Sequence, residues 1–279
     1  MLLATGVESS ILAFTAAAGR ALSCVAATLV LWLRPQPNKH SKSVAVALRM
    51  DHSSLILIVE AQRNSRAMAS PELLYKIFRH FRSHRMRLFE RTFQISRRTR
   101  VLDVGGSPLI WQFASVQPRL TILNFPSALV PHSHAFDQVA GDGRFLPFGD
   151  SSFDVVFSNS VIEHVGARSE QRRFAEEVAR VGKQFWIQTP NRGFPVELHM
   201  MLPFVHYLPK TWQHRIVTRF TGWQFVVHPP PEERAGYVHH FLHELNLLTA
   251  QDLRALFPQA TVISERIAGI PKSLVAVRS

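Results

Sequence analysis

The fold is decided by the stretch RVLDVGGSPLIWQFASV, residues 100–116. Its opening residues are mostly apolar and β-branched, which favours a short strand. Gly105 and Gly106 follow at once, and after them come Ser107 and Pro108, residue types that cap a helix and occupy its first position. Glycines let the backbone approach a ligand closely, and a helix that starts there favours negative groups. The stretch therefore predicts a strand, a tight turn and a helix beside a polar ligand.

Two common phosphate-binding turns are absent from the sequence. A dinucleotide-binding turn reads G-x-G-x-x-G, whereas residues 105–110 read GGSPLI. A P-loop ends in Gly-Lys-Ser or Gly-Lys-Thr, and neither occurs in the chain. What remains is an acidic residue, Asp103, near the end of the strand and two glycines after it. A purely structural turn would look similar, so the interpretation depends on the rest of the chain.

The rest of the chain repeats the alternation of strands and helices. Further strands are expected at residues 120–124, up to residue 140, and at 155–157, 183–190, 261–267 and 273–277. A helix is expected over residues 169–180. This alternation is typical of a parallel sheet with helices on both faces, in which ligands bind beyond the carboxyl ends of the strands. The polar residues at or just past those ends are Asp103, Asn124, Asp142 and Asn159.

Three segments, VLDVGG, AGDGRFLPF and SNSVIEHV, follow one another at residues 101–106, 140–148 and 158–165. In this order they resemble three motifs of class I S-adenosylmethionine-dependent methyltransferases, and the resemblance covers about residues 100–278. It implies an α/β fold with a Rossmann-like, doubly wound sheet of seven strands, mostly parallel with an antiparallel last strand. It also implies S-adenosyl-L-methionine as the cofactor.

The resemblance assigns the first motif to the methionine part of the cofactor. The turn at Gly105 and Gly106 would pack on that part, and Asp103 would help to orient it. Asn124 stands where the family has an acidic residue that holds both ribose hydroxyls. An amide is a weaker acceptor than a carboxylate, so this departure predicts a modest cofactor affinity unless a neighbour compensates.

The second and third motifs are implied to bind the adenine and to line the site of methyl transfer. Asp142 would receive the adenine amino group, with Gly143 and Arg144 along the ring. Ser158 and Asn159 would line the methyl-transfer face. These roles follow from the resemblance, which is a better guide to the cofactor than to the acceptor.

Methyl transfer from a sulfonium is an in-line displacement, so alignment and exclusion of water supply much of the acceleration. His164 follows the fourth predicted strand, close to the expected acceptor, and is the candidate catalytic base. The alternative for His164 is a hydrogen-bonded structural histidine. Its neighbour Glu163 is expected to be structural or to lie on the cofactor side.

Residues 190–248 separate the fifth strand from the next helix and are far longer than an ordinary connection of roughly 2 to 6 residues. An insertion at the carboxyl edge of the sheet is where a substrate lid belongs. The candidates for acceptor contact are Glu197, His199, His206, Tyr207, His239 and His240. These histidines lack the spacing of a zincin and the chain has one cysteine, so no metal site is predicted.

The formal net charge of +12 is concentrated in the front third of the chain. Residues 71–100 carry nine basic and two acidic side chains, whereas residues 101–279 carry 16 and 15. A surplus this local does not predict a nucleic-acid partner. Residues 70–98 predict a basic amphipathic helix, which either covers the sheet with a solvated cationic face or touches an anionic membrane surface peripherally.

Residues 1–69 are expected to form a poorly structured extension ahead of a methyltransferase domain at 70–279. Residues 11–33 are largely apolar, but Arg20 leaves an uninterrupted run shorter than the ~20 residues that span a bilayer. A membrane anchor or a cleaved signal is the alternative. Met50 and Met68 are candidate translation starts.

Together these features predict a cytoplasmic S-adenosylmethionine-dependent methyltransferase that acts on a small-molecule or lipid-like acceptor. One cysteine fits a reducing compartment. The alternative, motivated by Asn124, is a non-catalytic relative that binds but does not turn over. A nicotinamide-dependent dehydrogenase is disfavoured because the glycine pattern is missing.

Overall fold

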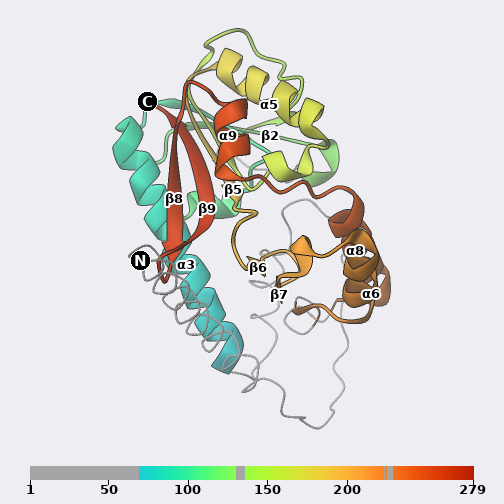
Figure 1. Cartoon of the computed structure of the whole chain (residues 1–279). Helices are drawn as coiled ribbons and strands as arrows, with labels where there is room; N and C mark the ends of the chain where they lie inside the picture. Colours follow the sequence, from blue (N-terminus) through green and yellow to red (C-terminus); the bar gives the residue numbers. More distant parts are fainter. Residues whose placement is uncertain (1–68, 130–135, 223, 225–228) are drawn as a thin grey trace, which may run out of the picture.

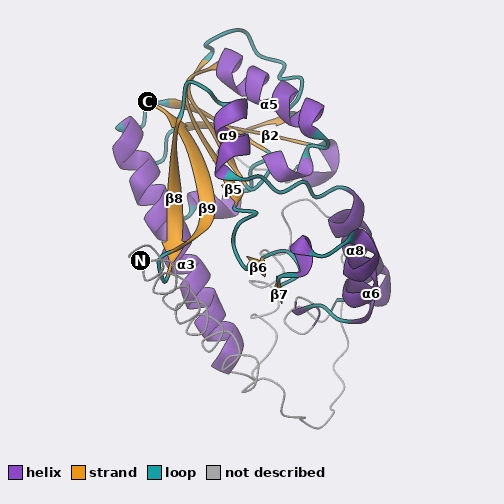
Figure 2. Ribbon diagram, in the orientation of Figure 1, coloured by secondary structure: helices purple, strands orange, loops and turns teal. Residues whose placement is uncertain are grey.

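The computed structural model describes residues 69–129, 136–222, 224 and 229–279. These residues fold around a seven-stranded sheet with helices on both faces (Figures 1 and 2). The elements, with η marking a 3-10 turn, are α3 (Ala69–Phe93), β1 (Arg100–Val104), α4 (Pro108–Trp111), β2 (Arg119–Asn124), η1 (Pro126–Ala128), β3 (Asp137–Ala140), β4 (Phe153–Asn159), η2 (Ile162–His164), α5 (Arg168–Val181), β5 (Gly182–Pro190), β6 (Val196–Glu197), β7 (Leu202–Pro203), η3 (Val205–Tyr207), α6 (Lys210–Arg219), α8 (Pro231–His243), α9 (Ala250–Leu256), β8 (Thr261–Ile267) and β9 (Ile270–Arg278).

The strand order of the sheet is β3-β2-β1-β4-β5-β9-β8. The strands β1 to β5 pair in parallel, and β9 runs antiparallel to both of its neighbours. The direction of strand addition reverses between β1 and β4, which creates the crevice where ligands bind in such sheets. The predicted fold class, a doubly wound seven-stranded sheet with an antiparallel last strand, is confirmed.

Apolar side chains pack on both faces of the sheet, as the alternation along its strands requires. Val101 of β1 packs on the side of α3 and α4, and its neighbour Leu102 packs on the side of α5 and α9. Figure 2 shows the helices on either side of the strands. The two cores leave the carboxyl ends of the strands free for polar side chains.

Helix α3 differs from the prediction in its length and in its faces. It ends at Phe93 rather than at residue 98. Arg85, expected on a solvated cationic face, is buried, whereas Leu88, expected on the apolar face, is exposed. Met86 takes a place in the core beside Phe89 instead. The basic face is therefore divided, and one of its charges points into the protein.

The first turn has the predicted geometry, but the helix after it is short. Gly105 has φ of 70°, a conformation that glycine adopts without strain, and its N–H donates to the carbonyl oxygen of Leu123 at 2.7 Å. Ser107 caps α4 by accepting from the N–H of Leu109 at 3.4 Å. Because α4 has only four residues, the expected contribution of its dipole to ligand binding is small.

The long connection at residues 190–248 packs around a small core of its own. Its elements β6, β7, α6 and α8 lie together beyond one end of the sheet (Figure 1). The apolar residues that they bury are Met200, Leu202, Val205, Val217, Tyr237, Val238, Phe241 and Leu242. The segment is thus a folded insertion, and its role as a lid stays a prediction.

The predicted extension, residues 1–69, lies outside the described residues apart from Ala69, the first residue of α3. The interpretations of residues 11–33 and of the alternative starts fall in the same region. Every helix in the part of the chain that the structure describes is too short or too polar to span a bilayer.

Candidate active site

A cavity of about 740 Å³ lies where the carboxyl ends of the parallel strands face the 190–248 insertion. Cavities of this size are typical of small-molecule sites. The predicted site residues that line it are Asp103, Gly105, Gly106, Asn124, Asp142, Gly143, Arg144, Asn159, His164, His199 and His240. The predicted site residues outside its lining are Ser158, Glu197, His206, Tyr207 and His239.

Two of the predicted residues point away from the cavity. The buried hydroxyl of Ser158 donates to the backbone oxygen of Val104 at 3.0 Å, which ties β4 to β1. This hydrogen bond engages the Ser158 hydroxyl between the two strands, and Ser158 is not among the lining residues of the cavity. His239 is exposed on α8, where its ring centroid lies 4.6 Å from that of His243. Neither Ser158 nor His239, which the sequence predicts in the site, is among the residues that line the cavity.

His206 and Tyr207 also lie outside the lining of the cavity. The Nε2 of His206 and the hydroxyl of Tyr207 lie 3.0 and 2.9 Å from the backbone oxygen of Arg192. These contacts fasten η3 to the start of the insertion. Glu197 is buried behind the cavity wall, where it holds the backbone and side chain of His199.

Asp103 lies at the floor of the cavity and is fully buried. The Nε1–H of Trp111 donates to its Oδ2 at 2.8 Å, and its Oδ1 has no hydrogen-bond partner among the described residues. Burial raises the pKa of Asp103 to about 7, against the lowering effect of the Trp111 hydrogen bond. A Cβ on Gly106 would lie 1.9 Å from Oδ2, so glycine is required there. The site thus holds a buried carboxylate oxygen that lacks a donor.

We expect Asp103→Asn to stabilise the protein more at pH 8 than at pH 5. A carboxyl whose pKa is raised on folding destabilises the native state as pH rises from the unfolded pKa to the folded one, here by up to roughly 4 kcal/mol. Asparagine keeps the shape and still accepts from Trp111. Urea unfolding of both proteins at several pH values measures the effect, and a difference independent of pH would contradict it.

The side chain of Asn124 makes hydrogen bonds to the backbone around the glycine turn. Its Nδ2 donates to the carbonyl oxygen of Gly106 at 3.1 Å, and its Oδ1 accepts from the N–H of Phe125 at 2.9 Å. An aspartate in this orientation would set a carboxylate against the Gly106 carbonyl. The amide therefore fits the local backbone, while each of its polar atoms retains capacity for one further hydrogen bond.

Asp142 is held by its neighbour Arg144, whose Nε lies 3.0 Å from each carboxylate oxygen. The Nη1 of Arg144 donates to Glu170 at 3.0 Å. Burial opposes ionisation of Asp142, but the hydrogen bonds and charge of Arg144 outweigh it and hold the pKa of Asp142 below its usual range. The ring of Phe125, which is 46% exposed, lines the same end of the cavity. This end offers an ionised acceptor and an aromatic face.

His164, on η2, begins a chain of hydrogen bonds that leads across to α8. Its Nδ1 lies 2.8 Å from Nε2 of His240, and Nδ1 of His240 lies 2.6 Å from a carboxylate oxygen of Glu244. His199 approaches from the insertion with its ring centroid 5.1 Å from that of His164. The Nδ1 of His199 lies 2.6 Å from Glu197. Two histidines in the cavity wall are therefore each oriented by a neighbouring side chain.

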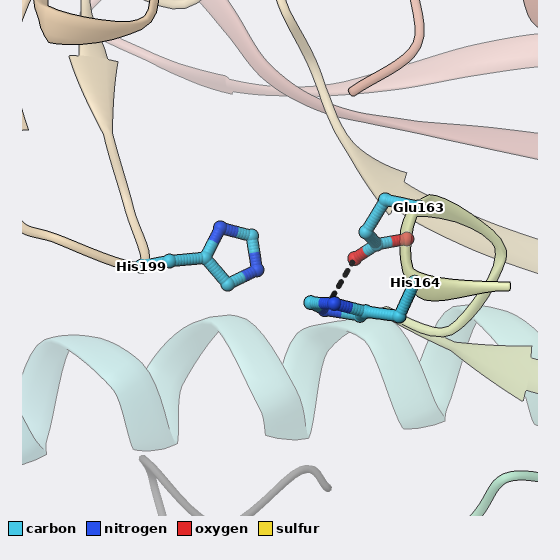
Figure 3. A group of neighbouring side chains, drawn as sticks. All are labelled: Glu163, His164 and His199. Carbon is cyan, nitrogen blue, oxygen red and sulfur yellow. Dashed lines mark ion pairs between the residues drawn. The ribbon is translucent and has the colours of Figure 1, made fainter. Parts of the chain in front are cut away.

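Glu163 is fully buried beside these histidines (Figure 3). The hydroxyl of Thr189 donates to its Oε2 at 2.9 Å. Its Oε1 has no hydrogen-bond partner within the described ranges and lies 3.9 Å from Nε2 of His164. Burial raises the pKa of Glu163 to about 7, against the lowering effect of the nearby His199.

Arg85, which is not among the predicted site residues, enters the cavity wall from α3. It makes a bidentate ion pair with Glu265 of β8, at 2.7 and 2.6 Å. Its Nη1 also donates to the side-chain oxygens of Asn159 and of Gln188, the latter at 3.2 Å. No local pattern distinguishes Arg85 from the other basic residues of its helix, so only the tertiary fold identifies it.

Lys272, near the start of β9, is a second missed cation in the cavity wall. Its Nζ lies 3.8 Å from Glu265 and 4.7 Å from the centre of the Phe81 ring. Burial and then the charge of Arg85 lower the pKa of Lys272 to about 8, against the raising effect of Glu265. One wall of the cavity is therefore cationic.

The sequence profile of the family described as "Methyltransferase domain" matches residues 111–184. The biotin biosynthesis bifunctional protein BioHC of Cellvibrio japonicus is 31% identical over 108 residues, which are 36% of this chain and 22% of that protein. The match thus spans about a fifth of that relative's length.

Solved structures of similar fold include the magnesium protoporphyrin IX methyltransferase of Synechocystis PCC 6803, solved with bound S-adenosylhomocysteine. That likeness has 10% identity and a TM-score of 0.47, over 82% of this chain and 96% of that one. Another is a SAM-dependent methyltransferase from Aquifex aeolicus, with 12% identity and a TM-score of 0.40, over 69% and 87%.

The profile match covers the segment from α4 to the start of β5, and the glycine turn precedes it. The strand order is that of a doubly wound sheet, the fold class that the sequence predicts for the rest of the chain. Over residues 111–184 the chain is therefore similar to the methyltransferase-domain family.

Proposed function

We propose that the cavity binds S-adenosylmethionine and that the protein transfers its methyl group to a small-molecule or lipid-like acceptor. The observation that carries the proposal is the buried Oδ1 of Asp103 beside the glycine turn, for which the described part of the chain supplies no donor. A buried carboxylate oxygen without a donor is costly, and a bound ammonium group would donate to it and balance the charge of the carboxylate. The amino group of the cofactor's methionine part has this chemistry.

The other end of the cavity fits the adenosine part. Asp142 offers acceptor oxygens to an exocyclic amino group, and the face of Phe125 offers a surface for stacking. Asn124, between the two ends, keeps hydrogen-bonding capacity for ribose hydroxyls. Asp103, Asn124 and Asp142 thus follow one another in the order of the amino group, the ribose and the adenine along the cofactor.

When bound, the cofactor supplies an electrophilic methyl group on a sulfonium. The insertion, which contributes His199, Tyr237 and His240 to the cavity wall, would exclude water and align the acceptor. His164 faces the same space and would take the proton that the acceptor loses. The chain through His240 to Glu244 provides the route by which that proton leaves.

Asp142→Ala is expected to lower the affinity for S-adenosylhomocysteine at least about 10-fold, because a charged hydrogen bond contributes roughly 1.5–3 kcal/mol. Isothermal titration calorimetry measures it. His164→Ala should leave this affinity unchanged and lower turnover by roughly 100-fold or more, since the histidine acts on the acceptor. Incorporation of labelled methyl groups into metabolite extracts measures turnover and identifies the acceptor.

Asp150→Ala serves as the matched control for charge, because Asp150 is 79% exposed and lies outside the cavity. An unchanged affinity in Asp142→Ala would contradict the adenine position. Binding without any labelled product would favour the alternative, a non-catalytic binding module. Binding of NADH in place of S-adenosylhomocysteine would overturn the assignment of the cofactor.

A further inference from the structure

Three side chains that are distant in sequence converge on one point of the cavity wall. Figure 3 shows His199 reaching from the insertion toward Glu163 and His164 of η2. One ligand atom from each residue can be chosen so that all three atoms lie within 4.8 Å of one another. Two imidazoles and a carboxylate are a ligand set that proteins use for divalent transition metals.

The carboxylate of this cluster is buried and incompletely satisfied. Glu163 is fully buried, and Thr189 occupies only its Oε2. Its Oε1 faces the histidines with no hydrogen-bond partner among the described residues. An unpaired buried carboxylate oxygen costs folding free energy, so a cation or a hydrogen-bond donor beside Oε1 would stabilise the protein.

His199 is oriented as a metal ligand is. Glu197 accepts from the backbone N–H groups of His199 and Met200, which fixes the carboxylate in place. Its Oε1 lies 2.6 Å from Nδ1 of His199, so a neutral ring donates there and keeps its lone pair on Nε2. In Figure 3 the ring edge opposite Nδ1 faces Glu163 and His164. A carboxylate behind the imidazole is the usual second partner of a metal-binding histidine.

The hydrogen bonds of His164 likewise favour a neutral ring with its lone pair on Nε2. A carboxylate only accepts, so the Nδ1 of His240 donates to Glu244, and a neutral His240 then accepts at Nε2. The donor to that Nε2 is Nδ1 of His164, and a neutral His164 keeps its lone pair on Nε2, the atom that faces Glu163. Both histidines thus direct a lone pair toward the buried carboxylate.

We propose that Glu163, His164 and His199 bind a divalent transition-metal ion such as Zn²⁺ in the wall of the cavity. Metal–ligand distances are about 2.0–2.2 Å. To reach them, the three ligand atoms must move closer to one another by roughly an ångström. Three protein ligands leave a fourth position open toward the cavity, as in catalytic rather than structural zinc sites. The sequence predicts no metal because these ligands come from two segments without a recognised spacing.

The metal site stands on geometry alone, but its use rests on the proposed function. An ion in this position would hold an oxygen or nitrogen of the acceptor as its fourth ligand and so align it with the methyl group. His164 would then hold the ion instead of taking a proton. Loss of turnover on chelation, restored by Zn²⁺, is the expected behaviour.

The test is titration of the chelator-treated, dialysed full-length protein with Zn²⁺ by calorimetry, and with Co²⁺ by visible absorption. One equivalent is expected to bind, and both His199→Ala and Glu163→Gln are expected to weaken binding at least about 100-fold by removing a ligand. Glu197→Gln should weaken it about 10- to 100-fold, because it loosens His199 without removing a ligand. His239→Ala, which removes an exposed histidine outside the cavity, should bind normally.

Circular dichroism of each variant establishes that it is folded. The proposal is overturned if the folded wild-type protein binds neither ion, or if His199→Ala and His239→Ala bind equally well. Full turnover after chelation, with His164→Ala still impaired, would assign His164 to proton transfer and remove the ion from the reaction. Because the titration needs no cofactor, its result is independent of whether S-adenosylhomocysteine binds.

Discussion

Gly106→Ala is expected to abolish measurable cofactor binding, with an affinity for S-adenosylhomocysteine lower by about 100-fold or more. The new Cβ would lie 1.9 Å from Oδ2 and 2.0 Å from Cγ of Asp103. The carboxylate cannot swing aside without breaking its bond to Trp111 in a fully buried setting. The same overlap should reduce the free energy of unfolding by roughly 1–3 kcal/mol. Calorimetry and urea unfolding measure the two effects.

Gly149→Ala is the matched control, because a Cβ at Gly149 meets nothing within 4 Å. It should leave both cofactor affinity and stability unchanged. If Gly106→Ala bound S-adenosylhomocysteine within about two-fold of the wild-type affinity, the turn would not be the part of the site that we infer.

Arg85→Met is expected to destabilise the protein by roughly 3–5 kcal/mol, because it leaves the buried carboxylate of Glu265 without its bidentate partner. Burial opposes the charge on Glu265, yet Arg85 and then Lys272 lower its pKa to about 2. A depressed pKa stabilises the folded state above the unfolded value near 4.5 and loses that effect as pH falls. The deficit of Arg85→Met should therefore be full at pH 7 and shrink below pH 4.5.

The double variant Arg85→Met with Glu265→Met is the control for this prediction. Replacing a whole buried ion pair by apolar side chains is often nearly neutral, so the double variant should recover much of the lost stability. Urea unfolding of the two single variants and the double variant gives their coupling. Strictly additive losses would mean that Arg85 stabilises the protein through other contacts.

The order of the elements and the position of the cavity could be predicted because they follow from local patterns. Strands of five to nine residues and the glycine turn are determined by residues that are adjacent in the sequence, and the carboxyl ends of parallel strands must meet at one edge. Asp103, Asn124, Asp142 and Asn159 reach the cavity for that reason. Ser158 does not, because it is buried and its hydroxyl is bonded to the backbone of β1.

The contacts that the sequence could not predict depend on long-range packing. Arg85 reads as one of several cations on a basic helix, and it becomes part of the site only because Glu265, 180 residues later, lies opposite. His199 meets Glu163 and His164 only because the insertion folds back over the strand ends. His206 and Tyr207, from the same insertion, turn to its own backbone instead.

The most direct test of the central claim is a crystal structure of the protein with S-adenosylhomocysteine. We predict its amino group within hydrogen-bonding distance of Asp103, its adenine between Asp142 and Phe125, and its sulfur facing the space lined by His164 and His199. Density for the nucleoside at any other place on the protein, or an empty cavity in crystals grown at saturating ligand, would contradict the account.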